Sequence, residues 1–404
     1  MTKSALEGIR VIDFGHVWAG PYCTATLADM GAEVIRVESK RHIDIHRRQG
    51  PYLNDKPGFN RSAVWNAQNR GKFGCTLNLA KPDGVELAKR LVAISDVAVE
   101  NFAPRVMKKL GLDYPALREV KEDIILVSLP GFGSTGPAKD YISYGQSLLA
   151  ASGIAATTGY PDGPPMSLGE SYPDLVAALS AAFAILAALH HRTETGQGQH
   201  IDISQLEASM CLLPEALMEF SMNDTPRPRM GNEDDIMAPH GCYRCKGDDK
   251  WVAIAVATDE EWQAFRHAIG NPDWAKGERF ADGFGRWSNQ HDLDRLVEDW
   301  TKERTPYEVM EVLQKAGVAA GPSFNIEELV NDPHIKKREV FVEVEHPEMG
   351  KQIIYSPTWR LSGTPGRIQR RAPLLGEHNH YVFGELLGIS DKEIARLEQE
   401  EVIY

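Results

Sequence analysis

The first forty residues alternate between short β-branched segments and a helical segment. Residues 9–15, "IRVIDFG", form a β-branched run that ends at a glycine and predicts a buried strand. Residues 21–32, "PYCTATLADMGA", have helical spacing, and residues 33–39, "EVIRVES", predict a second buried strand. This order favours parallel pairing, so we predict an α/β fold with a large Rossmann-like parallel sheet. The segment lacks the G-x-G-x-x-G fingerprint, so ordinary dinucleotide binding has no support here.

The alternation continues through an apolar helix predicted over 174–191 and a further amphipathic helix that ends near residue 220. Residues 222–241 are then rich in proline, glycine and charge, which is typical of a linker or mobile loop. Residues 242–257 indicate a hairpin with its turn at 247–249, and residues 340–357 indicate a second one, with amphipathic helices between them. We therefore predict a large domain built from both chain ends, residues 1–222 and 331–404, and a smaller α+β domain at 223–330.

The charge balance of the chain limits its partners. The formal net charge is −13, which argues against non-specific binding of nucleic acid because such binding needs a basic surface. An anionic small molecule stays compatible, since a few local cations override the average. The N-terminal segment has no signal-peptide pattern, and the apolar run at 175–189 is shorter than a membrane span requires. We therefore expect a cytoplasmic location and no membrane partner.

Five scattered cysteines indicate a reduced protein rather than a disulfide framework. Cys242 and Cys245 form a C-x-x-C sequence, and His240 precedes them. A zinc site would need a second ligand pair at suitable spacing, and none follows. We therefore favour structural cysteines over a metal site and predict no metal.

Asp174 lies at the beginning of the long apolar run "LVAALSAAFAILAAL". Aspartate is a preferred helix N-cap, so local sequence alone favours a structural cap. A helix N-terminus also favours an ionised carboxylate through its free N–H groups and its dipole, which suits a reactive group. The two interpretations are compatible, and the rest of the chain has to decide between them.

Motifs along almost the whole chain resemble family III CoA-transferases, the CaiB/BaiF family that includes formyl-CoA transferase. They occur in the order found in that family: "VIDFGHVWAGPYCTATLADMGAEVIRVES", "NRGKFGCTLNLAKPDG", "SDVAVENFAPRVMKKLGLDYPAL", "SLPGFGSTGP", "AATTGYPDGPP", "RTETGQGQHIDISQLEA", "APLLGEHN" and "LLGISDKEIARL". The resemblance implies coenzyme A, carried as an acyl-CoA substrate, as the cofactor. It also implies an interlocked dimer of two ring-like protomers.

Asp174 matches the aspartate that performs covalent chemistry in this family. A carboxylate is a weak nucleophile, but it suffices against an acyl thioester because the thiolate leaves well. The resemblance implies a mixed anhydride, then an aspartyl-CoA thioester, then transfer of CoA to an acceptor acid. The thioester free energy is retained throughout, so neither ATP nor a metal is needed.

The resemblance also implies which residues contact CoA and the active site. Several have structural alternatives: a strand-to-helix turn for Val17 and Ala19, a solvated surface position for Lys72, core packing for Phe102 and helix packing for Tyr144. The full set that the resemblance assigns to CoA is His16, Val17, Trp18, Ala19, Ser39, Asn69, Lys72, Asn101, Phe102, Lys109 and Tyr144.

Two departures from formyl-CoA transferase concern the acceptor acid. Trp18 stands where that enzyme has a glutamine that contacts substrate, which argues against oxalate or formate. Residues 229–241, "RMGNEDDIMAPHG", stand where that enzyme has a glycine-rich flap, and they carry Gly231 and an acidic triplet instead. A flap role for this loop is a hypothesis, and the role of His240 within it stays open.

Two other functions compete with CoA transfer. An α-methylacyl-CoA racemase shares the fold, but its acid/base pair includes a histidine in the window before the aspartate, and this chain has none between His46 and His190. A non-catalytic subunit of a heteromeric CoA-transferase is the second alternative, and retention of Asp174 argues against it. We expect a homodimer, with a hetero-oligomer as the alternative. We further expect succinyl-CoA as donor and benzylsuccinate or another dicarboxylic or aromatic acid as acceptor.

Overall fold

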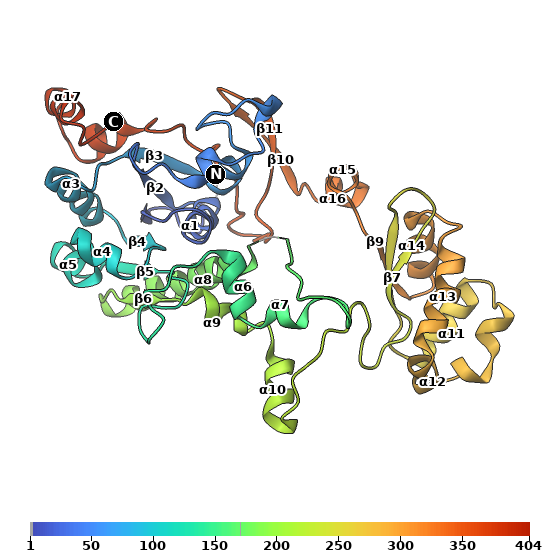
Figure 1. Ribbon diagram of the computed structural model, residues 1–404. Coiled ribbons are helices and arrows are strands. Elements are labelled where there is room, and N and C mark those ends of the chain that lie inside the picture. Colours follow the sequence, from blue (N-terminus) through green and yellow to red (C-terminus); the bar gives the residue numbers. More distant parts are fainter. Residues whose placement is uncertain (1–2, 170) are drawn as a thin grey trace. The chain divides into compact units, whose positions relative to one another are not determined.

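The structure, a computed structural model, describes residues 3–169 and 171–404. The chain divides into two compact units, and each is described by itself (Figure 1). The first unit comprises Met1–Ala155, Ser167–Pro226 and Lys336–Tyr404, and the second comprises Ala156–Met166 and Arg227–Ile335. The first unit is therefore assembled from both ends of the chain.

A six-stranded parallel sheet forms the centre of the first unit. Its strand order is β3-β2-β1-β4-β5-β6, so the order reverses between β1 and β4. Ligands of open α/β sheets bind at such a reversal, outside the carboxyl ends of the strands. The predicted parallel α/β fold is confirmed. The strands are β1 (Arg10–Asp13), β2 (Glu33–Glu38), β3 (Lys72–Thr76), β4 (Val97–Glu100), β5 (Ile125–Ser128) and β6 (His200–Asp202).

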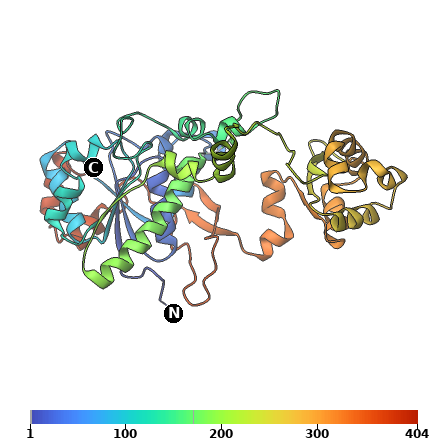
Figure 2. The ribbon, with the colours of Figure 1, turned by 90° about the horizontal axis from the view of Figure 1, so that it is seen from below.

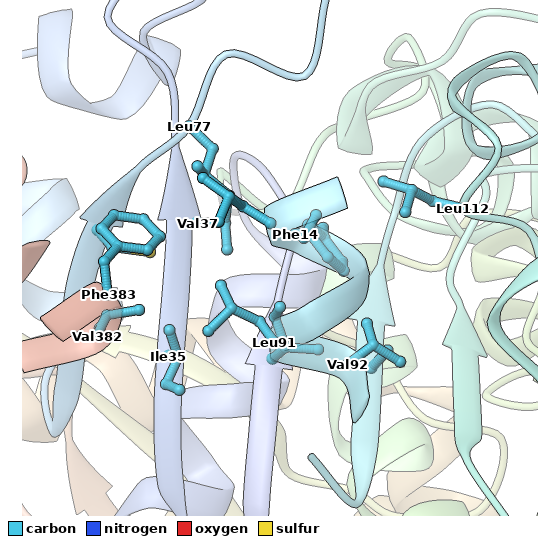
Figure 3. Close-up of a cluster of buried hydrophobic side chains, with 14 of the residues drawn as sticks. Phe14, Ile35, Val37, Leu77, Leu91, Val92, Leu112, Val382 and Phe383 are labelled. Carbon is cyan, nitrogen blue, oxygen red and sulfur yellow. The ribbon is translucent and has the colours of Figure 1, made fainter. Parts of the chain in front are cut away.

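Helices cover both faces of this sheet because its strands are apolar on both sides. Val11 belongs to a core cluster with residues of α1 and α8, whereas its neighbour Ile12 belongs to a second cluster with residues of α3 and the C-terminal helices. Figure 3 shows part of this second cluster, with Leu91 and Val92 of α3 and with Val382 and Phe383. Figure 2 shows the long helix α8 lying across the sheet. The helices of this unit are α1 (Ala19–Asp29), α2 (Ala63–Gln68), α3 (Pro82–Ala93), α4 (Arg105–Leu110), α5 (Tyr114–Val120), α6 (Gly145–Ala151), α8 (Tyr172–Thr195), α9 (Gln205–Met210), α10 (Pro214–Asn223) and α17 (Asp391–Gln399).

The C-terminal part of the chain returns to the edge of the sheet beside β3. Gly71 N–H donates to Arg370 O at 2.9 Å, and Asn78 N–H donates to Val402 O at 2.9 Å. Val382 and Phe383, from a π-helical segment at His380–Leu386, are fully buried in the same core as Ile12. The predicted hairpin near residue 350 is present as β10 (Phe341–His346) and β11 (Gly350–Tyr355).

The second unit has its own core beneath a three-stranded antiparallel sheet, in the order β7-β8-β9. The predicted hairpin across residues 247–249 is present as β7 (His240–Arg244) and β8 (Trp251–Ala255), and β9 (Ala319–Pro322) adds a third strand that sequence reasoning missed. Its helices are α11 (Asp259–Ala268), α12 (Gly283–Ser288), α13 (Gln290–Thr301), α14 (Pro306–Lys315) and α15 (Ile326–Asn331). Two short helices lie where the chain passes between the units, α7 (Ile154–Thr157) and α16 (Pro333–Lys337).

Two helical predictions need comment. The single helix expected to end near residue 220 is instead two helices, α9 and α10, because Pro214 lacks an N–H and begins a new helix at its first position. Helix α8 is the one described helix long and apolar enough to cross a membrane, and half of its most apolar window is buried inside the protein. A core helix passes the same test, and α8 packs against the sheet.

Candidate active site

The loop that follows β1 lies at the reversal of strand order and meets the loop that follows β4. His16 N–H donates to Asn101 Oδ1 at 2.6 Å, and Asn101 Nδ2 donates back to His16 O at 2.7 Å. Gly15 and Gly20 close the loop tightly, since a Cβ atom on either would lie 2.9 Å from the Cα atom of the other. The two loops therefore form one rigid edge at which residues 16–19 and 101–102 gather.

Asp174 lies in the first turn of α8 and is 7% exposed. The N-cap is Ser171, so the sequence-based assignment of Asp174 as the cap is wrong. Ser171 Oγ donates to Asp174 Oδ2 at 2.5 Å, and the backbone N–H of Ala19, at the start of α1, donates to the same carboxylate. Burial raises the pKa of Asp174 above its ordinary value, and these donors offset part of that rise.

A cavity of about 710 Å³ opens in front of this carboxylate. Asp174 is the one carboxylate among the described residues that line it. Trp18 lies in its wall and packs edge-to-face on His46, with ring centroids 5.5 Å apart. The cavity brings together six of the residues expected to bind CoA: His16, Val17, Trp18, Asn101, Phe102 and Tyr144.

A second cavity, of about 960 Å³, lies in the same unit and shares His16 and Phe102 with the first. The shared residues show that the two cavities are neighbours. Its wall carries the cations Lys81, Arg105 and Lys109, as the phosphates of a nucleotide would require. Ser39 and Lys109, both assigned to CoA from the sequence, line this second cavity.

Three of the expected CoA contacts, Ala19, Asn69 and Lys72, line neither cavity. Lys72 is fully buried, and its Nζ donates to Asp13 Oδ2 at 2.9 Å, Pro21 O at 2.8 Å and Asn69 Oδ1 at 3.0 Å. Burial lowers the pKa of Lys72 to about 8. Lys72 and Asn69 therefore lie in the interior, where they stabilise the turn between β1 and α1, and they do not face a cavity.

Tyr144 is 65% exposed and is the N-cap residue of α6. The side chain is therefore not packed in the interior. The backbone N–H of Tyr144 donates to Ser147 Oγ at 3.0 Å, and the residue begins the helix at the cavity wall. Next to it, Gly145 faces the Asp174 carboxylate. A Cβ atom there would lie 1.7 Å from Ser171 Oγ and 2.6 Å from Asp174 Oδ2.

Glu100 is a buried acid at the end of β4 that sequence reasoning missed. Burial raises the pKa of Glu100 to about 7, although Ser128 and the backbone donate to it. Phe102 N–H donates to Glu100 Oε2 at 2.7 Å, and Ser128 Oγ lies 3.0 Å from His200 Nε2. The available signal was an acidic residue directly after the apolar residues "VAV", and Asp13 follows the apolar pair "VI" in the same way. No comparable signal marks Ser171 or Gly145.

The 229–241 loop belongs to the second unit and is anchored there. Arg229 Nη1 donates to Ala156 O at 3.1 Å, and Gly231 N–H donates to Gly159 O at 2.9 Å. His240 Nδ1 lies 2.7 Å from Asn232 O. Within residues 3–169 and 171–404, no group of three or more histidine, cysteine, aspartate or glutamate side chains is placed to hold a metal ion.

Comparison with known proteins agrees with this geometry. The profile of CoA-transferase family III matches residues 6–379. The chain is 35% identical over 98% of both chains to succinyl-CoA–D-citramalate CoA-transferase of Chloroflexus aurantiacus, and 34% identical to the succinyl-CoA–L-malate CoA-transferase beta subunit of the same organism, over 100% of this chain and 99% of that one. The crystal structure of a CaiB/BaiF family protein from Brucella suis superposes with a TM-score of 0.87 at 31% identity, over 96% of this chain and 100% of that one. The chain is therefore an enzyme of CoA-transferase family III, as its sequence motifs indicated.

Proposed function

We propose that this enzyme moves CoA from succinyl-CoA to a carboxylic acid through an aspartyl-CoA thioester on Asp174. The observation that carries the proposal is the position of Asp174, the one carboxylate in the described cavity wall, at the N-termini of both α1 and α8. Helix N-termini stabilise an anion and the oxyanions that form next to it. The relatives named for succinyl-CoA support the choice of donor.

The proposed steps balance without a further reactant. Asp174 attacks the succinyl carbonyl and releases CoA thiolate, which leaves a mixed anhydride. The thiolate then attacks the aspartyl carbonyl, so that succinate leaves and an aspartyl-CoA thioester remains. The acceptor carboxylate attacks that thioester, and the thiolate released attacks the acceptor carbonyl of the new anhydride. The products are the acceptor acyl-CoA and a free Asp174 carboxylate.

CoA itself is proposed to lie across both cavities of the first unit. Lys109 and Arg105 provide cations for its phosphates in the second cavity, while Phe102 and His16, which line both, flank the passage. The thioester end then reaches Asp174. Asn101 holds the loop that carries His16, so its contribution is to the shape of the passage.

For the acceptor, we propose a dicarboxylic acid. The relatives named for D-citramalate and L-malate support this class, and the Trp18 side chain in the cavity wall is compatible with the bulkier benzylsuccinate. A panel of malate, citramalate, glutarate, oxalate and benzylsuccinate, with the monocarboxylic acids formate and acetate, each offered with succinyl-CoA, separates these acids by kcat/KM. Highest efficiency with a monocarboxylic acid would contradict the proposal.

The decisive experiment is covalent trapping. The enzyme is incubated with succinyl-CoA, treated with borohydride or hydroxylamine and digested, and the peptide that contains Asp174 is measured by mass spectrometry. We expect a modified Asp174, and neither modification nor turnover in Asp174→Ala. Asp162→Ala, an exposed aspartate of the second unit, serves as control and should behave like wild type. Turnover by Asp174→Ala would exclude the aspartyl intermediate.

We further propose a homodimer in the cytoplasm, interlocked as in the family. Exposed apolar side chains support a buried interface on α8 (Leu179, Phe183 and Leu186) and on α10 (Leu217, Met218, Phe220 and Met222), since large apolar patches on a protein surface usually mark interfaces. One relative is a subunit of a heteromer, so a partner chain is the alternative. Light scattering of the purified chain distinguishes a dimer from a monomer that awaits its partner.

A further inference from the structure

Val17, in the loop between β1 and α1, has a backbone φ of 64°. This is the left-handed region, which a β-branched residue rarely enters because its side chain crowds the backbone. Strained residues of this kind persist only where their surroundings hold them, and they concentrate at functional sites. Val17 lines the cavity in front of Asp174 and lies two residues before Ala19, whose N–H donates to the Asp174 carboxylate.

The Asp44 side chain holds the N–H of Val17, and the His46 side chain also hydrogen-bonds to the Val17 backbone. Val17 N–H donates to Asp44 Oδ2 at 3.0 Å, and the other oxygen, Oδ1, accepts from His46 N–H at 2.9 Å. Asp44 is 1% exposed. Helix α1 has no capping hydrogen bond from the side chain of its own N-cap residue, Trp18. The acceptor for this turn is therefore supplied from 27 residues further along the chain.

Asp44 is itself the end of a buried row of alternating charges. Arg36 Nη2 donates to Asp44 Oδ2 at 2.9 Å, Arg36 Nη1 donates to Asp13 Oδ1 at 3.2 Å, and Lys72 donates to the other oxygen of Asp13. All four side chains are at most 1% exposed. Two cations and two anions balance, which such a buried group requires.

The same row contacts the backbone at three points of one turn. Asp13 Oδ1 accepts from Gly15 N–H at 2.9 Å, Asp44 accepts from Val17 N–H, and Lys72 donates to Pro21 O. Asn101 holds His16 between the first two points. Hydrogen bonds from these buried side chains therefore fix the backbone at intervals from residue 15 to residue 21. Among Asp13, Asp44, Lys72 and Asn101, Asp44 is the one that contacts Val17.

We propose that Asp44 is a positioning residue: it keeps Val17 in the left-handed conformation and thereby aims the Ala19 N–H at the Asp174 carboxylate. The inference rests on the proposed function of Asp174. Asp44 touches no reacting atom, and its effect passes through the backbone of residues 17–19. Without it, Val17 returns to an ordinary conformation, which is favoured by roughly 5- to 150-fold for such a residue, and the N–H turns away from the carboxylate.

Glycine at position 17 makes this mechanism testable, because glycine adopts positive φ about as readily as negative φ. The experiment measures kcat for CoA transfer in wild type, Val17→Gly, Asp44→Ala and the double variant. We expect Asp44→Ala to lower kcat about 10-fold or more when residue 17 is valine. We expect less than about a threefold loss when residue 17 is glycine.

A matched control separates positioning from loss of a buried ion pair. Asp29 pairs with Arg70 at 2.5 Å, with both side chains at most 2% exposed, but neither contacts the turn. Asp29→Ala should lower thermal stability as Asp44→Ala does, and Val17→Gly should give it no rescue. If Asp44→Ala itself does not fold, Arg36→Met/Asp44→Ala removes both partners and leaves Asp13 paired with Lys72. The same rescue by Val17→Gly is then expected.

The outcomes are distinct. An equal loss of kcat from Asp44→Ala in both backgrounds overturns the positioning role and leaves Asp44 with a structural role alone. No loss in either background overturns it as well. Covalent trapping of wild-type Asp174, measured in the same preparations, reports on the nucleophile separately. If Asp174 is trapped but Val17→Gly does not restore the kcat of Asp44→Ala, the positioning role of Asp44 is refuted and the proposed function stands. If wild type turns over without any trapped Asp174, the proposed function is refuted.

Discussion

The hydroxyl of Ser171 lies 2.5 Å from Oδ2 of Asp174, and it donates to the carboxylate instead of capping its own helix. This contact joins the N-cap of α8 to the residue that we propose as nucleophile. A donor to the charged form of a carboxyl group lowers its pKa, and a donor near a reacting carbonyl stabilises an oxyanion. Ser171 is therefore expected to affect both the ionisation and the reactivity of Asp174.

Ser171→Ala removes this donor. Burial then raises the pKa of Asp174 with less opposition, so the acid limb of kcat/KM moves to higher pH, and kcat/KM at neutral pH falls about 10-fold. The measurement is the pH profile of CoA transfer. Ser167→Ala is the control, because Ser167 Oγ donates to Gln146 Oε1 and not to Asp174. An acid limb at the same pH in both variants would mean that the hydroxyl does not act on Asp174.

Gly145→Ala tests the space beside this pair. The added Cβ atom would lie 1.7 Å from Ser171 Oγ, so the hydroxyl has to turn away and the carboxylate has to shift. We expect kcat to fall about 100-fold, since a displacement near 1 Å at a reacting group has effects of that size. Circular dichroism should show a folded protein, because a serine rotation relieves most of the clash. Gly363→Ala, where no atom lies within 4 Å of the new Cβ, should keep full activity.

Glu100→Gln tests the buried acid at the end of β4. Because burial raises the pKa of Glu100 to about 7, its contribution to stability is complete below the ordinary value of 4.5 and is lost as pH rises through 7. Glutamine carries no charge and keeps an oxygen for Phe102 N–H. Relative to wild type, Glu100→Gln should therefore gain stability at pH 8 compared with pH 5, by about 1–3 kcal/mol.

Urea unfolding at the two pH values measures this difference. The groups that face Glu100 are Ser128 on β5 and Asp202 on β6, and His200 contacts Ser128. His200→Gln is the matched comparison: burial lowers the pKa of His200, so relative to wild type this variant should gain stability at pH 5 compared with pH 8, the opposite sense to Glu100→Gln. An identical stability difference at pH 5 and pH 8 would show that Glu100 keeps its ordinary pKa in the folded protein.

Substitutions of Lys72 and Lys109 are expected to have different effects, because Lys72 stabilises the fold and Lys109 lines a ligand cavity. Lys72→Met leaves Asp13 with one cation fewer in a fully buried site, so the free energy of unfolding should fall by about 3–5 kcal/mol. Lys109→Met changes a side chain that lines the second cavity, so the KM for acyl-CoA should rise about 5- to 10-fold with little change in stability. Thermal unfolding and initial rates in the same buffers measure both. If Lys72→Met were as stable as wild type but had a raised KM for acyl-CoA, Lys72 would be a ligand-binding residue and not a structural one.

Local sequence patterns were sufficient for the sheet and for much of the cavity wall. The strands at Arg10–Asp13 and Glu33–Glu38 are short segments rich in valine and isoleucine, and such segments form buried parallel strands where helices alternate with them. The loops after β1 and β4 follow those strands directly, so His16, Trp18 and Phe102 were predictable as neighbours at the carboxyl edge. Pro214 shows the limit of periodicity, since one missing N–H divides an otherwise continuous pattern.

The fold class and the family follow from the sequence by itself, and the proposal of Asp174 as nucleophile also starts there, because all three depend on the order of residues along short segments. The partners of Asp174 do not, since Ser171, Gly145 and Ala19 come from three different segments. Lys72 is the clearest case: its local sequence is compatible with a surface cation, and only the pairing of β3 beside β2 places it under the turn, next to Asp13. Whether a charged side chain meets a ligand or another charge depends on which strands are neighbours, and that is decided by tertiary packing.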